Sequence, residues 1–119
     1  MANSPRMTVR NNAAAAQYEL VADGAVIGLA QYQERPGQIA FVHTEIAPEV
    51  SGQGLGQVLV SAALDDARSK GLAVLPYCSF VRHYVETHPQ YQDLVPPERR
   101  PAFGLPLTLP DAARKGSLE

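Results

Sequence analysis

The sequence contains one cysteine among 119 residues, so no internal disulfide can form and a zinc site built from several cysteines is excluded. Its net charge of −2 provides no basic field that would attract nucleic acid or an anionic membrane. No apolar run approaches the roughly 20 residues that a membrane-spanning helix needs. The N-terminus also lacks the basic and apolar segments of a secretory signal. We therefore expect a cytoplasmic protein with no metal, nucleic-acid or membrane partner.

The composition is that of a globular protein, with 45% hydrophobic and 18% charged residues. A chain of this length forms one domain and buries a core without metals or disulfides. We expect three parts along the chain. They are a partly frayed N-terminal segment (1–16), a folded domain (17–95) and a proline-rich tail (96–119). The N-terminal segment could add an edge strand at 7–10. The tail is expected to be extended or disordered, and at most partly docked through Phe103, Leu105 and Leu107.

The first half of the domain predicts an antiparallel meander. Apolar and polar residues alternate with period two over three segments, 17–22, 25–34 and 38–46. Asp23-Gly24 is a strong hairpin turn between the first two, and Arg35-Pro36-Gly37 turns the chain again. Three strands joined by short turns are therefore expected to lie side by side.

The second half changes to helical periodicity. Residues 58–70 place apolar side chains on one helix face, and a buried-strand pattern follows at 72–75. A second helix is expected over 80–87, ended by His88-Pro89. A strand–helix–strand unit of this size makes a right-handed crossover, so strand 72–75 should lie parallel to strand 38–46. The fold class is α/β (α+β): a mixed sheet in which an antiparallel meander precedes a β-α-β crossover and a second helix.

The loop between strand 38–46 and the first helix is the strongest functional signal. Residues 51–57 read Ser-Gly-Gln-Gly-Leu-Gly-Gln, and glycine costs about 1 kcal/mol relative to alanine inside a helix. Glycines at a strand-to-helix junction let a phosphate approach the free amides of the first helical turn. A Walker loop is excluded because no lysine precedes Lys70, and Leu59 stands where a dinucleotide fingerprint needs its third glycine. The alternative is a tight turn with close helix packing.

Three candidate catalytic residues follow from the strand order. Parallel strands end at the same sheet edge, where α/β sheets bind ligands, so Cys78 is expected beside the glycine loop. Cys78 also precedes the second helix, and thiols at helix N-termini are more reactive than free thiols. Simple alternation places Phe41, His43 and Glu45 on one strand face, opposite Val42, Thr44 and Ile46.

Each candidate has a plain structural alternative. His43 is either a general base or a half-buried histidine hydrogen-bonded to a neighbour. Glu45 is either a base or a solvated carboxylate at the end of a strand. Cys78 is either chemically active or an inert packed side chain, and these alternatives remain open at this point.

Taken together, four motifs resemble the minimal, single-domain branch of the GNAT acetyltransferase superfamily over about residues 18–94. They are His43-Thr44-Glu45-Ile46, Pro48 to Gly56, Pro76 to Val81, and His88-Pro89-Gln90-Tyr91. In that superfamily an Arg/Gln-x-x-Gly-x-Gly/Ala signature holds the pyrophosphate of coenzyme A with backbone amides. Gly54 and Gly56 match its small positions, whereas Ser51 replaces the first residue and Ser79 stands where relatives carry proline. Ser51 is a possible helix cap instead.

The resemblance implies acetyl transfer from acetyl-CoA to an amine of a small molecule, a protein lysine or a protein N-terminus. It implies cofactor contacts from the strand end and the loop: Ile46, Ala47, Val50, Ser51, Gly52, Gln53, Gly54, Leu55, Gly56 and Gln57. Phe80 and Tyr84 on the second helix are expected to contribute as well. His43 or Glu45 would act as base, and Cys78 as a thiol acid or transient acyl carrier. Two alternatives remain, a non-catalytic acyl-CoA-binding module and a thiol hydrolase that needs Cys78 within reach of His43.

Overall fold

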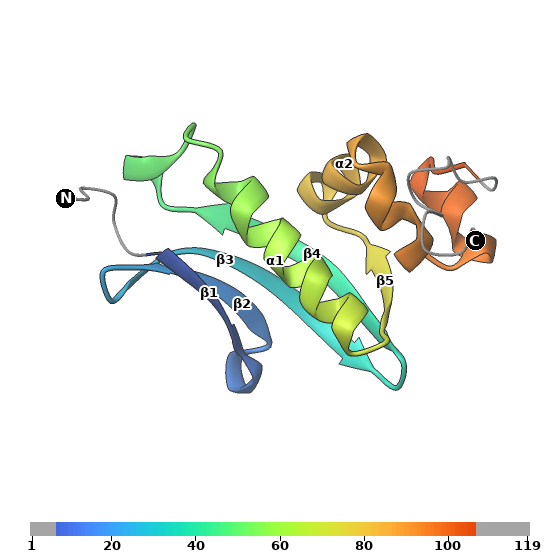
Figure 1. Ribbon diagram of the computed structural model, residues 1–119, viewed down its shortest axis with the longest axis horizontal. Coiled ribbons are helices and arrows are strands. Elements are labelled where there is room, and N and C mark those ends of the chain that lie inside the picture. The colour runs from blue at the N-terminus through green and yellow to red at the C-terminus, as the bar shows by residue number, and fades with distance from the viewer. Residues whose placement is uncertain (1–6, 107–119) are drawn as a thin grey trace.

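The computed structural model describes residues 7–106, which form one curved five-stranded sheet covered by helices (Figure 1). The strands lie in chain order, and all neighbours are antiparallel except β4 and β5, which are parallel. The elements are β1 (Met7–Asn12), η1 (Ala13–Ala15), β2 (Gln17–Ala22), β3 (Ala25–Arg35), β4 (Gln38–Ile46), η2 (Pro48–Val50), α1 (Leu55–Ser69), β5 (Ala73–Pro76), α2 (Ser79–Thr87), η3 (Pro89–Leu94) and η4 (Pro97–Phe103). The predicted fold class is confirmed, including the meander and the parallel crossover.

The edge strand β1 is longer than the sequence indicates. It pairs with β2 from Met7 to Asn12, so the edge strand considered at 7–10 is present, and only residues 11–12 depart from the expectation of a frayed segment. Glu19 on β2 fastens the pair, because its carboxylate accepts hydrogen bonds from Gln17, Asn12 and Arg10 at 2.7, 3.0 and 2.9 Å. These bonds hold the pKa of Glu19 below its ordinary value.

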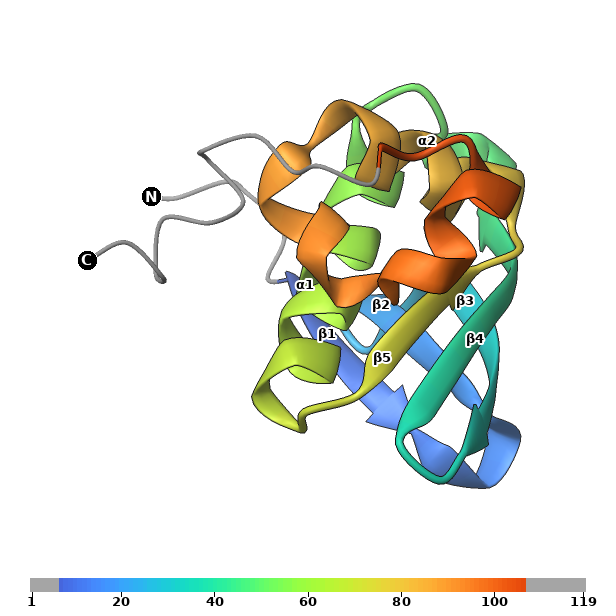
Figure 2. The same cartoon turned by 90° about the vertical axis from the view of Figure 1, so that its right-hand side faces the viewer.

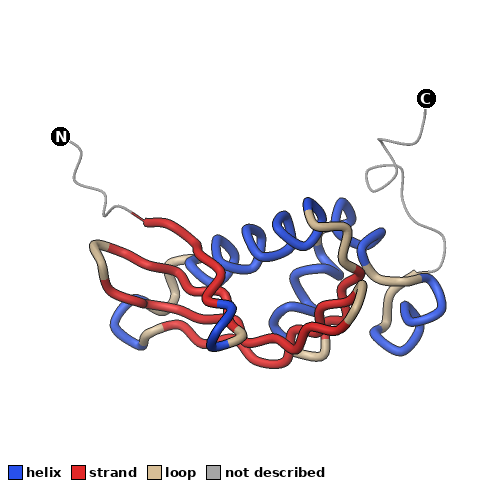
Figure 3. Tube along the Cα trace, turned by 90° about the horizontal axis from the view of Figure 1, so that it is seen from below, coloured by secondary structure: helices blue, strands red, loops and turns tan. Residues whose placement is uncertain are grey.

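Helices α1 and α2 lie on the same face of the sheet (Figures 2 and 3). Tyr18 on β2 donates to Asp66 of α1, and Thr44 on β4 contacts Cys78 at the start of α2. Both strand residues belong to one face, because Tyr18 pairs with Ala30 and Ala30 pairs with Thr44. We call this the inner face, and the opposite one the outer face. The core lies between the inner face and the helices and includes Leu20, Phe41, Leu59 and Val74.

A β-bulge at Val42 changes the alternation along β4. Gln31 pairs with His43 while the next residue, Tyr32, pairs with Phe41, so Val42 is the extra residue. Phe41 therefore lies in the core, and His43 and Glu45 project from the outer face. The prediction that Phe41, His43 and Glu45 share a face is wrong, because one inserted residue reverses every side chain beyond it.

The C-terminal part of the described chain is ordered and packed, which corrects the expectation of an extended tail from Pro96. Residues 97–103 form the 3-10 helix η4, which lies beside the end of β5 (Figure 2). Phe103 and Leu105 are buried, and Arg100 donates to the carbonyl of Val95 at 2.9 Å. The prolines were misleading because a 3-10 helix accepts proline at its start. Leu107 lies outside the described residues.

We expect Phe103→Ala to lower the free energy of unfolding by about 3 kcal/mol, because it leaves a cavity in the core. Phe103 is 6% exposed and contacts the Tyr77 ring edge-on at 5.3 Å between centroids. Phe80→Ala is the matched control. Because Phe80 is 41% exposed, this substitution should lower the free energy of unfolding much less. Urea unfolding measures both. Equal, small losses would mean that residues 97–105 do not complete the core.

Candidate active site

The central feature of the site is a gap between β4 and β5. Their parallel pairing ends at Phe41 and Pro76, where the Cys78 N–H donates to the Phe41 carbonyl at 2.8 Å. β4 then continues for five more residues to Ile46, whereas the segment after β5 leaves the sheet and forms α2. The bulge at Val42 lies where the two strands separate. A segment of β4 is thereby left without β5 as a neighbour.

The backbone groups of Thr44 and Ile46 face this gap. The Ala47 N–H donates to the Ile27 carbonyl at 2.8 Å, and ladder bonds of an antiparallel pair alternate along the strand. Residues 43, 45 and 47 therefore bond toward β3, whereas 44 and 46 point their N–H and C=O groups away from it. The amide of Ile46 therefore faces the gap, and its contact with a ligand stays a prediction. The amide of Ala47 does not face the gap, because it is already bonded to the Ile27 carbonyl.

The glycine loop joins β4 to α1 at the wide end of the gap. Gly54 is the N-cap of α1 with φ 75°, a left-handed conformation that favours glycine, and a Cβ there would meet no atom within 4 Å. No side chain of residues 7–106 caps this helix. The amides of Leu55, Gly56 and Gln57 in the first turn lack partners within the helix, and the space beside Gly54 is open. An anion fits this cradle through the amides and the positive end of the helix dipole.

Two neighbours of this loop depart from the predictions. Ser51 does not cap α1, because its hydroxyl donates to the Pro48 carbonyl at 3.2 Å. The amides of Val50 and Ser51 are also bonded, to Ala47 and Pro48. The amides of residues 50–51 are therefore already used within the loop, whereas the cofactor contacts predicted at residues 52–57 stay a prediction.

Close packing, rather than a ligand, explains why residue 56 is a glycine. A Cβ there would lie 2.7 Å from Cζ of Phe80, so α1 and α2 approach closely at this point. The packing alternative thus applies to Gly56, while Gly54 is left for a ligand. Phe80 stays partly exposed beside the loop. Tyr84 is largely buried and stacks on His88 at 3.8 Å between ring centroids, so it offers a cofactor little surface.

Cys78 lies at the inner mouth of the gap as the N-cap of α2. Its side chain is 8% exposed, and Sγ lies 3.4 Å from Oγ1 of Thr44. The sequence reasoning did not select Thr44 as a site residue. Only a correct placement of the bulge would have turned Thr44 toward the cysteine.

His43 and Glu45 form a hydrogen-bonded pair on the outer face. Nε2 of His43 lies 2.7 Å from Oε2 of Glu45, and their side chains are 51% and 63% exposed. A carboxylate that holds one ring nitrogen fixes the orientation of the imidazole. Cys78 contacts Thr44 from the inner face, so it does not share a face with His43. This separation removes the geometry that a thiol hydrolase needs.

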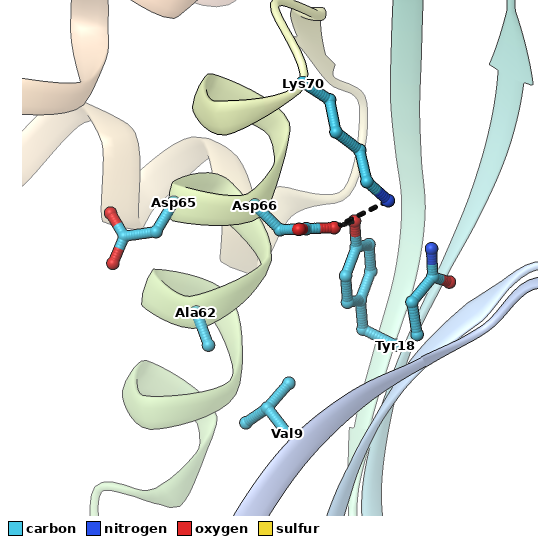
Figure 4. A pocket seen from close by; sticks show the side chains of 7 residues that line it. Val9, Tyr18, Ala62, Asp65, Asp66 and Lys70 are labelled. Carbon is cyan, nitrogen blue, oxygen red and sulfur yellow. Dashed lines mark hydrogen bonds and ion pairs between the residues drawn. The ribbon is translucent and has the colours of Figure 1, made fainter.

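One cavity reaches Glu45 of the pair. It is open, has a volume of about 190 Å³, and is lined by Leu29, Glu45 and Ile46 where the start of β3 lies beside the end of β4. A cavity of about 510 Å³ lies elsewhere, between β1, β2 and α1 (Figure 4). Burial and the bond to Asp66 raise the pKa of Tyr18 there, and Lys70 pairs with the same carboxylate at 2.9 Å. These polar groups satisfy one another, so they join β2 to α1.

Two structural absences apply to residues 7–106. No group of three or more His, Cys, Asp and Glu side chains in this part of the chain is arranged to hold a metal ion. Within the same range, no helix has the length and apolar character to cross a membrane.

Two features define the class of protein to which this fold and site belong. One is a mixed sheet whose two parallel strands separate, and the other is a helix that begins after a glycine and has no side-chain cap among residues 7–106. The start of such a helix is suited to a phosphate-bearing ligand. A family model described as GCN5-related N-acetyl-transferase matches residues 17–94. The chain belongs to this family.

A solved structure from Staphylococcus aureus shares this fold. The solution structure of a GCN5-like protein from Staphylococcus aureus is 23% identical, with a TM-score of 0.58, and the match covers 80% of this chain and 91% of that one. The ribosomal-protein-S18-alanine N-acetyltransferase from Escherichia coli is 22% identical with a TM-score of 0.46 over 49% of this chain. This chain spans only 38% of that enzyme's length. A comparison with curated proteins found no match.

Cys78 provides a test of access from the cofactor side. We expect its alkylation to be slower than that of a free thiol, because 8% of it is exposed, and to slow at least severalfold further with saturating acetyl-CoA. Alkylation rates of the folded protein, measured with and without acetyl-CoA, check this. Equal rates in both conditions, or reaction only on unfolding, would return Cys78 to a packing role.

Proposed function

We propose that this protein is an acetyl-CoA-dependent N-acetyltransferase that moves an acetyl group to an amine. The observation that carries the proposal is the gap between β4 and β5, which has an anion cradle at its wide end and the pair of His43 and Glu45 on its outer side. Beyond Phe41, the edge of β4 that faces away from β3 has no strand paired with it in residues 7–106. Two substrates can therefore approach each other from opposite sides.

The residues fit an acyl-CoA. The open approach to the first turn of α1 accommodates a pyrophosphate, held by the amides of residues 52–57. An extended amide-bearing chain along the gap would hydrogen-bond to the exposed edge of β4, as an added strand does. Acetyl-CoA supplies the reaction with an acetyl thioester.

In the proposed reaction, different side chains accept and donate the protons. Neutral His43 accepts the proton of the attacking amine, and Glu45 stabilises the imidazolium that results. The N–H of Ile46 donates to the thioester oxygen as negative charge develops there, typically the larger contribution to rate. As the new C–N bond forms and the C–S bond breaks, Cys78 donates its own thiol proton to the departing thiolate; solvent then takes the proton from His43 and restores the one on Cys78. An acyl-carrier role for Cys78 is disfavoured because its contact is with Thr44 rather than a base.

A non-catalytic acyl-CoA-binding module is the second candidate. It is favoured by the exposure of His43 and Glu45, since catalysis is usually sheltered from water. The experiment combines calorimetric titration of acetyl-CoA with an assay of amine-dependent CoA release on free amines and peptides. Binding together with amine-dependent release is the expected result. Binding without release on any amine would favour the module, and consumption without an amine would favour a hydrolase.

A further inference from the structure

A second polar cavity, of about 240 Å³, opens where β3, β4 and β5 meet η4. Its floor consists of Ala40 and Leu75, which pair across β4 and β5. Gln33 pairs with Ala40, and Arg35 pairs with Gln38, so these residues share the outer face. The outer face also carries His43, three residues farther along β4. We call this cavity the arginine pocket; its full lining is Gln33, Arg35, Gln38, Ala40, Leu75, Tyr77 and Arg99.

The wall of the arginine pocket opposite β3 is held in place by packing. Nη2 of Arg99 donates to the Tyr77 hydroxyl at 2.6 Å, and its guanidinium carbon lies 5.9 Å from the centre of the Phe103 ring. Tyr77 in turn contacts Phe103 edge-on. The guanidinium is therefore oriented before any ligand arrives, which reduces the entropy lost on binding.

The charge of the pocket is unbalanced. Among residues 7–106, two arginines and two glutamines line it and no carboxylate does, although the whole chain carries −2. Between residues 7 and 106, neither Arg35 nor Arg99 belongs to an ion pair. Guanidinium groups offer several N–H donors each, and the amides and the Tyr77 hydroxyl add more. Such a set of donors suits the oxygens of an anion.

Coenzyme A does not account for this pocket. From Ala40 the strand runs six residues to Ile46 before the glycine loop, roughly 20 Å at the rise of a strand. The pyrophosphate cradle therefore lies at the other end of β4. His43 is much nearer, roughly 10 Å from Ala40 along the strand.

Resting on the proposed acetyl transfer, we propose that the arginine pocket binds a carboxylate of the acceptor, about three residue-lengths from the amine that His43 deprotonates. The acceptor class is then a short acidic peptide segment whose amine and carboxylate are separated by roughly 10 Å of extended chain. An α-amino acid is too short to reach both groups.

The test measures binding without turnover. NMR titration of the protein with saturating CoA compares the peptide Ala-Gly-Gly-Glu-amide with Ala-Gly-Gly-Gln-amide, which differs by one charge. We expect the acidic peptide to bind about tenfold more tightly, the effect of one charged hydrogen-bonded contact, and to shift amides near Gln38 and Tyr77. Arg35→Gln and Arg99→Gln should each remove most of this preference. Arg82→Gln on α2 is the matched loss of charge and should leave it unchanged.

Equal affinity for the two peptides, or no binding of the acidic one at millimolar concentration, overturns the proposal. Inorganic phosphate is the second arm. If phosphate shifts the same amides and displaces no acidic peptide, the pocket is a phosphate site and the proposal is wrong. An acidic preference without acetylation would leave this inference standing while removing the proposed function. Acetylation together with equal affinities for the two peptides would remove this inference and leave the proposed function standing.

Discussion

Gly54→Val is expected to weaken acetyl-CoA binding by roughly 10- to 100-fold, the effect of losing one charged hydrogen bond to the pyrophosphate. The valine side chain would occupy the open space at the N-terminus of α1, where no atom of residues 7–106 other than those of its chain neighbours lies within 4 Å of the added Cβ. It would also strain a backbone held at φ 75°. Calorimetric titration measures the change in Kd.

Gly37→Val separates the two effects. Gly37 has the same φ of 75° and the same open surroundings, but it lies in the β3–β4 turn at the opposite end of β4. It should lose similar stability and keep its acetyl-CoA affinity. If both variants lose affinity equally, backbone strain is the cause and the loop is not the pyrophosphate cradle.

His43→Ala is expected to lower kcat by roughly 10² to 10⁴, the usual contribution of a positioned general base. The affinity for acetyl-CoA should stay unchanged, because His43 lies on the outer face and the cradle lies at the start of α1. Steady-state kinetics with a saturating amine, together with a titration of acetyl-CoA, measure both quantities.

Glu45→Gln is the graded companion to His43→Ala. It keeps a hydrogen-bonding partner for His43 at 2.7 Å but removes the charge that stabilises the imidazolium, so its loss in kcat should be smaller. An unchanged kcat in His43→Ala would remove the histidine from the mechanism. A larger loss in Glu45→Gln would make the carboxylate itself the base.

Much of the fold follows from local patterns in the sequence. The hairpin at Asp23-Gly24, the parallel placement of β5 and the end of α2 before Pro89 each depend on nearby residues, and each is confirmed. The bulge at Val42 could not be predicted in this way. Nothing in the alternating run from 38 to 46 identifies an extra residue, because its position depends on pairing with β3.

The site was predictable in position and less so in detail. The order of strands predicted that Cys78 and the glycine loop follow adjacent strands, because that depends on topology alone. The bonded amide of Ala47, the partner of Ser51 and the burial of Tyr84 all depend on tertiary contacts that leave no local pattern. The arginine pocket was missed for the same reason, since Arg35 and Arg99 are brought together only by η4.

One measurement tests the central claim most directly: an NMR titration of the isotopically labelled protein with acetyl-CoA. We predict that the first and largest shifts occur at the amides of residues 52–57 and at Ile46, which line the cradle and face the gap. Shifts confined to residues outside the glycine loop and the β4–β5 gap would contradict the proposed site.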